Sequence, residues 1–527
     1  MFARLNKQEL VSNVWVNSKE EVRYKKNGLG QLKEAQFAMT PQGGASNYDS
    51  TDAPLSYVSA NYDYDSAGRT LSVKHYWNQL VSGNYAVEAI RGSSAAYATD
   101  LGLKSSTSFL TRATAGSPNW STVRTENYGY DQHFDYLTSV DYNDGLANEV
   151  QTWDYDAAGN RISASANPGT WTYDNLNRMS ASPGVLYFHD MVGNRTAKSV
   201  NTVETRYEWD SVNRMTKIGK TSGDVNFKYR ADGMRVRKST ATAVESVFYD
   251  GQMPVETFED FVTGNDVLTR NFVGARGIEA MFTTANNSTT AAYPLYDTHG
   301  NMVATLSKNT AGTSWSVGDE RSYDVWGSVR SGATTGGPKG RYVANLGHVQ
   351  DDESGLIYMR ARYYEPETGR FVSEDPAHDG SNWYVYCKNC PINFWDANGK
   401  NAVAGFIGFL VGFIIGFMGE FVESFFGGNP PPGAGDALRN GLIGAIMGFG
   451  AEVGATMALA AGNSALLGGI GGAIGAIAAF ALAVYIGKMF FWLGEAMFAG
   501  DYGGVGQDWT QRMPIPWDPF NQRAESN

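Results

Sequence analysis

The chain has 527 residues, with 54 acidic and 42 basic side chains and a formal net charge of −12. This balance argues against a nucleic acid as partner, because nucleic-acid binding needs a clustered basic face. Two cysteines are too few for a disulfide framework or a four-thiolate zinc site, and the six histidines show no ligand spacing, so we expect neither a metal nor a cofactor.

The first 400 residues are rich in aromatic repeats. Residues 1–50 are predicted to form β-structure at the start of the repeats, and residues 51–340 carry a unit of two alternating aromatics, an acid, two residues and Gly or Asn. It occurs as WDYDAAGN from Trp153, WTYDNLN from Trp171 and YEWDSVN from Tyr207. Alternating aromatics predict a strand with one buried face, and the acid with Gly or Asn predicts a tight turn.

Each repeat unit is therefore predicted to be a β-hairpin. A hairpin of about twenty residues cannot bury its aromatic face alone, so neighbouring units are expected to stack in an elongated, curling β-sheet. In this interpretation the repeated Tyr, Trp and Asp residues are scaffold. A carbohydrate-binding role for the exposed aromatics is the alternative.

A distinct motif follows the repeats, in residues 341–400. Residues 355–376 read GLIYMRARYYEPETGRFVSEDP, and residues 383–399 read WYVYCKNCPINFWDANG. Together with the Tyr-Asp repeats, these stretches resemble the core domain of Rhs (rearrangement hot spot) proteins, which is related to the C components of Tc toxins and to teneurin shells. The resemblance implies a mainly β fold in which the repeat hairpins spiral into a hollow shell that residues 341–400 plug. It also implies a variable C-terminal effector, often released by self-cleavage.

Two aspartates match the pair to which self-cleavage is attributed in related proteins. They are Asp375 and Asp396, with Asp379 as a third nearby carboxylate and with Arg362 and Arg370 as candidates to orient an aspartate. Two carboxylates held close together share one proton, so one can activate water while the other donates a proton. The resemblance thus implies an intramolecular aspartic-type protease. The alternative is that Asp375 and Asp396 only cap turns.

The cleavage site implied by the resemblance is the Gly399–Lys400 bond. The family pattern there resembles P-x-x-x-x-D-P-x-G-L, and Pro391, Asp396 and Gly399 are in register with it. The chain departs from the pattern at Ala397, where the family has proline, and at Lys400, where it has leucine.

Residues 401–498 are hydrophobic and glycine-rich. Residues 402–419 are 18 uncharged residues, enough for a membrane-spanning helix, and two further apolar helices are predicted before residue 498. Gly408, Gly412 and Gly416 recur every fourth residue and allow close helix packing, whereas Glu452 lies in the middle of a predicted span, where a carboxylate usually faces a pore or a partner. A plain anchor or a buried helical bundle is the alternative. Residues 499–527 are predicted to be a polar, irregular tail.

These features predict a polymorphic toxin-like protein whose β-shell delivers a membrane-inserting effector. The expected partners are a target membrane, a cognate immunity protein, secretion-system components and other copies of the C-terminal helices. The N-terminus has no apolar stretch behind a basic start, so we expect secretion or surface display in a bacterium by a route without a cleavable signal peptide, with the C-terminal region membrane-associated. The alternatives are a membrane-anchored adhesion or contact protein with a structural shell, and a protease that acts once on itself.

Overall fold

A computed structural model describes residues 7–11, 14–18, 21–38, 56–82, 84–99, 102–144, 148–308, 315–400 and 402–404. The chain divides into two units, residues 1–416 and 417–527, and every described residue belongs to the first. The regular structure of these residues consists of β-strands and two short 3-10 helices, which confirms the prediction of a mainly β protein.

The predicted helical tail lies outside the described residues, apart from the three residues of one short strand at 402–404. Gly408, Gly412, Gly416 and Glu452 are therefore not described, nor is the polar ending at 499–527. Within the part of the chain that is described, no helix has the length and apolar character needed to cross a membrane.

The first large sheet has ten described strands, which follow one another in chain order, each antiparallel to the next. Its strands are β3 (Glu21–Lys26), β4 (Leu32–Ala38), β5 (Ser56–Tyr64), β6 (Thr70–Val81), β7 (Asn84–Tyr97), β8 (Lys104–Arg112), β9 (Trp120–Tyr130), β10 (Leu137–Asn143), β11 (Asn148–Tyr155) and β12 (Arg161–Ala164).

The second large sheet has fifteen described strands in the same meander. Its strands are β13 (Thr172–Tyr173), β14 (Met179–Ser182), β15 (Val185–His189), β16 (Arg195–Val200), β17 (Val203–Trp209), β18 (Met215–Gly219), β19 (Val225–Tyr229), β20 (Arg235–Ser239), β21 (Ala243–Asp250), β22 (Met253–Phe261), β23 (Val267–Gly274), β24 (Gly277–Ala285), β25 (Ser288–Tyr296), β26 (Met302–Lys308) and β27 (Trp315–Gly318).

The remaining described strands form small sheets. The pairs are β1 (Lys7–Val11) with β2 (Val14–Ser18), β28 (Ser322–Tyr323) with β29 (Val329–Ser331), and β34 (Phe394–Asp396) with β35 (Ala402–Ala404). A four-stranded sheet contains β30 (Val349–Gln350), β31 (Ile357–Met359), β32 (Arg362–Glu365) and β33 (Arg370–Phe371). The 3-10 helices are η1 (Ala344–Leu346) and η2 (Cys387–Asn389).

The repeat acid builds the hairpin turn, as predicted. Between β11 and β12, Asp156 Oδ1 accepts hydrogen bonds from the backbone N–H groups of Ala158 (2.9 Å) and Asn160 (2.8 Å), and Gly159 has a φ of 78°. The same two bonds recur at Asp65, Asp174, Asp190, Asp210, Asp297 and Asp324. The aspartate thus satisfies backbone donors that the tight turn leaves without a strand partner.

A tyrosine directly before the turn joins many of the hairpins to the preceding hairpin. Tyr173 donates its hydroxyl hydrogen to the carbonyl of Arg161 at 2.7 Å, across the break between the two large sheets. The acceptor is the first residue of the strand that follows the previous turn. The same arrangement links Tyr64 to Leu32, Tyr97 to Thr70, Tyr155 to Leu137, Tyr229 to Met215, Tyr249 to Arg235 and Tyr323 to Met302. This bond gives the Tyr-Asp pair a scaffold role and stacks consecutive repeats in register.

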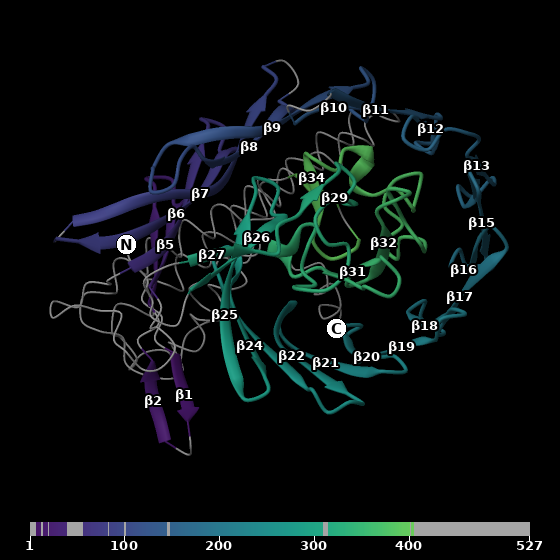
Figure 1. Ribbon diagram of the computed structural model, residues 1–527. Helices are drawn as coiled ribbons and strands as arrows, with labels where there is room; N and C mark the ends of the chain where they lie inside the picture. Colours follow the sequence, from purple (N-terminus) through teal and green to yellow (C-terminus); the bar gives the residue numbers. More distant parts are fainter. Residues whose placement is uncertain are drawn as a thin grey trace, which may run out of the picture. The chain divides into compact units, whose positions relative to one another are not determined.

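The core region, residues 341–400, lies within the arc that the repeat strands describe from β9 to β26 (Figure 1). Its aromatic and aliphatic side chains join those of the repeats in shared hydrophobic clusters. One such cluster combines Phe227 and Ile218 of the repeats with Leu356, Tyr363 and Val372 of the core region. The repeats therefore bury one face against the core region, which supplies the apolar surface that a single hairpin lacks.

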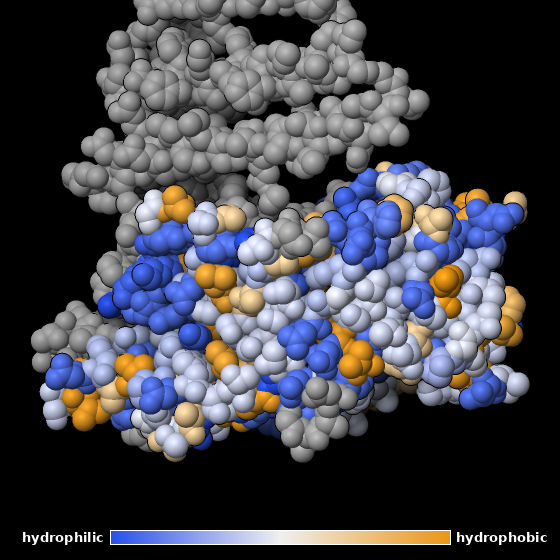
Figure 2. Space-filling view, turned by 90° about the horizontal axis from the view of Figure 1, so that it is seen from above, coloured by the Kyte–Doolittle hydropathy of each residue, from blue (hydrophilic) through white to orange (hydrophobic). Residues whose placement is uncertain are grey.

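The surface carries both polar and apolar side chains. Figure 2 shows apolar residues in small separate groups among polar ones on the face that it presents. Several of the exposed apolar side chains sit on the hairpin turns, such as Leu176 (56% exposed) and Met191 (96% exposed). Scattered exposed apolar residues of this kind are ordinary on a folded protein.

Candidate active site

The candidate site lies where two hairpins of the core region meet. The loop between β34 and β35 rests on the turn between β31 and β32, and the N–H of Ala361 donates to the carbonyl of Asn398 at 3.1 Å. Gly399 has a φ of 74°, and a Cβ at this position would overlap the carbonyl oxygen of Met359. Glycine is thus required both by the left-handed backbone and by the close approach of the two chains.

Arg362 holds the two predicted aspartates together. Its Nη2 lies 3.3 Å from Oδ2 of Asp396 and 3.7 Å from Oδ2 of Asp375, and its Nη1 donates to the carbonyl of Trp383 at 2.9 Å. All three charged residues are at most 4% exposed. Burial lowers the pKa of the Arg362 guanidinium, although both aspartates oppose this shift. We call Arg362, Asp375 and Asp396 the Arg362 cluster.

The Gly399–Lys400 peptide contacts this cluster on both sides of its C–N bond. Arg362 Nε donates to the Gly399 carbonyl oxygen at 2.5 Å, and the Lys400 N–H donates to Asp396 Oδ1 at 3.0 Å. Asn398 Oδ1 also accepts from the Lys400 N–H at 3.0 Å. A guanidinium on a carbonyl oxygen stabilises negative charge that develops there, and a carboxyl group beside the amide nitrogen can transfer a proton to it. Asp396 Oδ1 also accepts from the N–H of Asn398 at 3.3 Å, so Asp396 caps this turn with the same two bonds as the repeat aspartates.

The two remaining predicted residues lie outside the Arg362 cluster. Arg370 points to the repeats, where its Nη1 donates to Asn160 Oδ1 at 3.0 Å and its Nη2 to the Asn177 carbonyl at 2.7 Å. Asp379 is exposed on the loop that follows Asp375. The described contacts thus assign Arg370 to the junction between core and repeats.

The site contains two residues that the sequence analysis did not single out. Arg360 Nη1 donates to the carbonyl of Ala397, and His348 Nε2 approaches the same oxygen at 3.4 Å. The sequence does hold a signal for Arg360, because Arg360 is the first arginine of the R-A-R-Y-Y motif that also contains Arg362. Ala397 contributes a carbonyl, which proline also has, and Lys400 contributes its N–H, so neither departure from the family pattern removes a contact of the loop with Arg360 or Asp396.

The two cysteines flank this region as free, buried thiols. Burial raises the pKa of Cys390 to about 12, and the Cys390 sulfur accepts a hydrogen bond from Asn393 at 3.2 Å. A buried thiol with a raised pKa is a packing group rather than a nucleophile. Among the described residues, no three His, Cys, Asp or Glu side chains form a group that could hold a metal ion.

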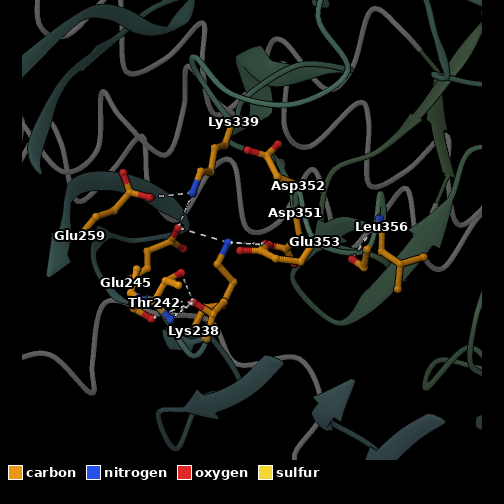
Figure 3. A network of polar contacts seen from close by, with 12 residues as sticks. Lys238, Thr242, Glu245, Glu259, Lys339, Asp351, Asp352, Glu353 and Leu356 are labelled. Atoms are coloured by element: carbon orange, nitrogen blue, oxygen red, sulfur yellow. Dashed lines mark hydrogen bonds and ion pairs between the residues drawn. The ribbon is translucent and has the colours of Figure 1, made fainter. Parts of the chain in front are cut away.

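A second buried charge cluster connects the repeats to the core region (Figure 3). Lys238 Nζ lies 3.5 Å from Glu245 and 3.4 Å from Asp351, and Lys339 Nζ lies 3.2 Å from Glu245 and 2.7 Å from Glu259. Arg235 completes it with a 2.6 Å contact to Asp351. We call Arg235, Lys238, Glu245, Lys339 and Asp351 the repeat–core ion network.

The pKa values of Lys238 and Asp351 both shift in the direction that favours the charged form of the side chain. Burial opposes the charge on Lys238, but Asp351 and Glu245 outweigh it and raise the Lys238 pKa. Burial likewise opposes ionisation of Asp351, but Arg235 and Lys238 outweigh it and lower the Asp351 pKa. Every member has an oppositely charged neighbour, so the network is typical of a structural contact.

Sequence relatives of the chain include nucleases and toxins. The tRNA nuclease WapA of Bacillus subtilis (strain 168) is 27% identical over 278 residues, which are 50% of this chain and 11% of that protein. The toxin protein Tse5 of Pseudomonas aeruginosa is 38% identical over 94 residues, which are 17% of this chain and 7% of that protein. The chain thus spans about a tenth of the length of these curated relatives.

One solved structure that resembles the chain is TcdB2-TccC3 without its hypervariable C-terminal region. The match covers 73% of this chain and 24% of the TcdB2-TccC3 chain at 14% sequence identity, with a TM-score of 0.39. No family model matches the chain. The sequence relatives, the Tyr-Asp hairpins and the R-A-R-Y-Y core motif together identify the chain as a member of the Rhs/YD-repeat family, which includes toxin-type proteins.

Proposed function

We propose that the chain is an Rhs-type toxin carrier that cuts itself once. Its repeats and core form a β-shell, the Arg362 cluster hydrolyses the Gly399–Lys400 bond, and the residues that follow are a hydrophobic effector that inserts into membranes. The observation that carries this proposal is that Arg362 binds the carbonyl of that peptide while Asp396 binds its N–H.

The proposed reaction is a simple hydrolysis. Water bonds to the Gly399 carbonyl carbon and gives one proton to the ionised carboxylate of the Asp375–Asp396 pair. Arg362 stabilises the oxyanion that results. The carbon–nitrogen bond then breaks, and the Lys400 nitrogen takes a proton from the protonated carboxyl of the pair. The products are a Gly399 carboxyl group and a Lys400 amine, between which a proton passes to give a carboxylate and an ammonium, and the pair again holds one proton.

The surroundings of the bond support this chemistry. Asp375 and Asp396 contact the same guanidinium nitrogen, so Arg362 holds two carboxyl groups close to the Gly399–Lys400 bond. Both aspartates are buried, as is Gly399, whereas Lys400 is exposed, so the bond lies at the edge of the buried region. Low local dielectric strengthens each of these electrostatic contacts.

Cleavage is tested with purified full-length protein on a denaturing gel and by mass spectrometry. The wild type should yield fragments that end at Gly399 and begin at Lys400, and Asp396→Asn and Asp375→Asn should each remain intact. Asp379→Asn is the matched control, because Asp379 is a nearby carboxylate that is exposed, and it should cleave like the wild type. An intact wild-type chain would overturn self-cleavage and favour an anchored shell of the adhesion type.

The effector is tested separately by expressing residues 401–527 in bacteria. We expect loss of membrane potential, relieved by a cognate immunity protein, and loss of this effect when Gly408, Gly412 and Gly416 are replaced by isoleucine. Insertion without depolarisation would support a plain anchor. Secretion of the carrier and its contact with secretion-system components belong to the same proposal and follow from the toxin relatives.

A further inference from the structure

Arg360 is the least compensated charge beside the candidate active site. Its described hydrogen bonds all go to backbone carbonyls: Nη1 donates to Ala397, and Nη2 donates to Leu346 and, at 3.1 Å, to Gln252. Burial lowers the pKa of its guanidinium to about 10. The guanidinium therefore remains protonated at neutral pH while it contacts dipoles instead of a carboxylate.

The three carbonyls that Arg360 binds come from three separate parts of the chain. Gln252 lies in the turn between repeat strands β21 and β22, Leu346 ends helix η1 of the core region, and Ala397 lies in the loop that carries the candidate cleavage site. The start of strand β22 and the residue that follows helix η1 also lie close together, since a Cβ on Gly347 would lie 2.9 Å from Pro254. Arg360 thus contacts the repeats, the core region and the cleavage loop at once.

The cleavage loop is fixed by donors on consecutive carbonyls. Arg360 and His348 bind the oxygen of Ala397, the N–H of Ala361 binds that of Asn398, and Arg362 binds that of Gly399. Burial and the neighbouring Arg360 hold the pKa of His348 well below its ordinary value, so His348 is neutral and donates through Nε2. Loss of the contact at the Ala397 carbonyl should therefore also shift the next two carbonyls along the chain, those of Asn398 and Gly399.

We propose that Arg360 is a positioning residue that makes the geometry of the Gly399–Lys400 peptide depend on docking of the β21–β22 hairpin. The inference rests on the proposed self-cleavage. Without Arg360 the loop keeps the contacts of Arg362 but loses the anchor that ties it to the repeats. A misplacement of about 1 Å at a reacting group lowers a rate about 100-fold, so the loss is measurable although Arg360 does not touch the bond itself.

The test measures the rate of cleavage after full-length protein is refolded from denaturant, with fragments quantified by mass spectrometry. Arg360→Ala should cleave about 100-fold more slowly than the wild type, and low millimolar guanidinium ion should restore part of that rate by occupying the vacated site. Arg360→Lys should recover less, because an ammonium cannot span three carbonyls. Arg237→Ala, at an exposed arginine of a repeat strand, is the control and should behave as the wild type.

Dependence on the repeats is tested by a one-residue glycine insertion between Gly251 and Gln252. It should slow cleavage like Arg360→Ala, and the two changes together should be no worse than either alone, because both remove the same contact. An equal insertion between the exposed Asn286 and Asn287 should have no effect. Wild-type rates in Arg360→Ala, or fully additive effects, would overturn this inference alone, whereas an uncleaved wild type would overturn the proposed function and this inference with it.

Discussion

The repeat–core ion network and the Arg362 cluster are both buried, yet their charges are compensated differently. In the network, Lys238 has Glu245, Asp351 and Glu353 within 3.5 Å, and the pKa of Lys238 is raised. In the Arg362 cluster one guanidinium serves two aspartates. Beside the cluster, the described hydrogen bonds of Arg360 all go to backbone carbonyls, and burial lowers the pKa of both arginines.

This difference separates a structural role from a chemical one. Charges that neutralise each other leave nothing to act on a third group, and their removal affects folding. Charges that are only partly compensated retain a field, and here that field falls on a peptide bond. Strongly perturbed groups at such sites are candidates for function, provided that geometry also places a reacting bond beside them.

The largest effect on stability is expected from breaking the ion network. Asp351→Asn removes the main counter-charge of buried Arg235 and one of the three carboxylates near Lys238, which should lower the free energy of unfolding by about 3–5 kcal/mol. Urea unfolding measures the change. Asp260→Asn, at an exposed aspartate of strand β22, is the matched control and should shift the midpoint little. Equal stability of the two variants would show that the network is not structural.

The next effect concerns the Arg362 cluster and falls on rate. Arg362→Lys keeps the charge but cannot contact the Gly399 carbonyl, the Trp383 carbonyl and both aspartates together, so cleavage should slow about 100-fold. Mass spectrometry of refolded protein measures the rate, and Arg237→Lys is the exposed control. Cleavage of Arg362→Lys at the wild-type rate would contradict a role for the guanidinium fork.

Acid should weaken a third ion cluster, at Glu365. Burial opposes ionisation of Glu365, but Arg195 and Lys198 outweigh it and lower its pKa from 4.5 to about 2. A carboxyl whose pKa is lower in the folded state stabilises the fold above its unfolded pKa, and this contribution is lost as the pH falls toward 2. From about pH 6 to about pH 3 the wild type should therefore lose about 2 kcal/mol more unfolding free energy than Glu365→Gln.

Urea midpoints at the two pH values measure this difference. Glu367→Gln is the control, because the Glu367 side chain is 75% exposed and also contacts Lys198. A variant at Glu365 with the same pH dependence as the wild type would contradict the assignment. The ion clusters would then contribute less to the fold than their geometry indicates.

The smallest predicted effect tests how closely the cleavage loop fits. Gly399→Ala adds a left-handed strain of about 1–2 kcal/mol and also a clash with Met359. Gly355→Ala has the same φ of 74° but nothing within 4 Å of the added Cβ, so it reports the strain alone. Thermal unfolding of both, with cleavage measured in parallel, should show slower cleavage only for Gly399→Ala.

The repeat hairpins could be predicted because their physics is local. A strand alternates its faces with a period of two, and an acid three residues before Gly or Asn binds its own turn, so Asp156 and Gly159 could be assigned from spacing. One copy departs from this rule: Arg230 replaces the acid, and Asp232 Oδ1 instead accepts from the Met234 N–H at 3.2 Å. The link from each repeat Tyr to the preceding hairpin was not predicted, since it joins strands of different units.

The site could be predicted only in part, because its residues meet through packing of the core region. Arg362 and Arg370 belong to neighbouring strands of one sheet and have the same chemistry, yet Arg362 faces the cleavage loop and Arg370 faces Asn160. Strand register decides this, and no spacing in the sequence reveals it. Arg360 was missed for the same reason, since its partners are backbone carbonyls distant in the chain.

Under the proposed function, the Arg362 cluster hydrolyses the Gly399–Lys400 bond with water. The most direct test is to refold the wild type in water enriched in oxygen-18 and to weigh the fragments. We predict a fragment that ends at Gly399 and carries one heavy oxygen in its new carboxylate, and a fragment that begins at Lys400 and carries none. An intact chain, a break at another bond, or a Gly399 carboxylate without heavy oxygen would contradict it.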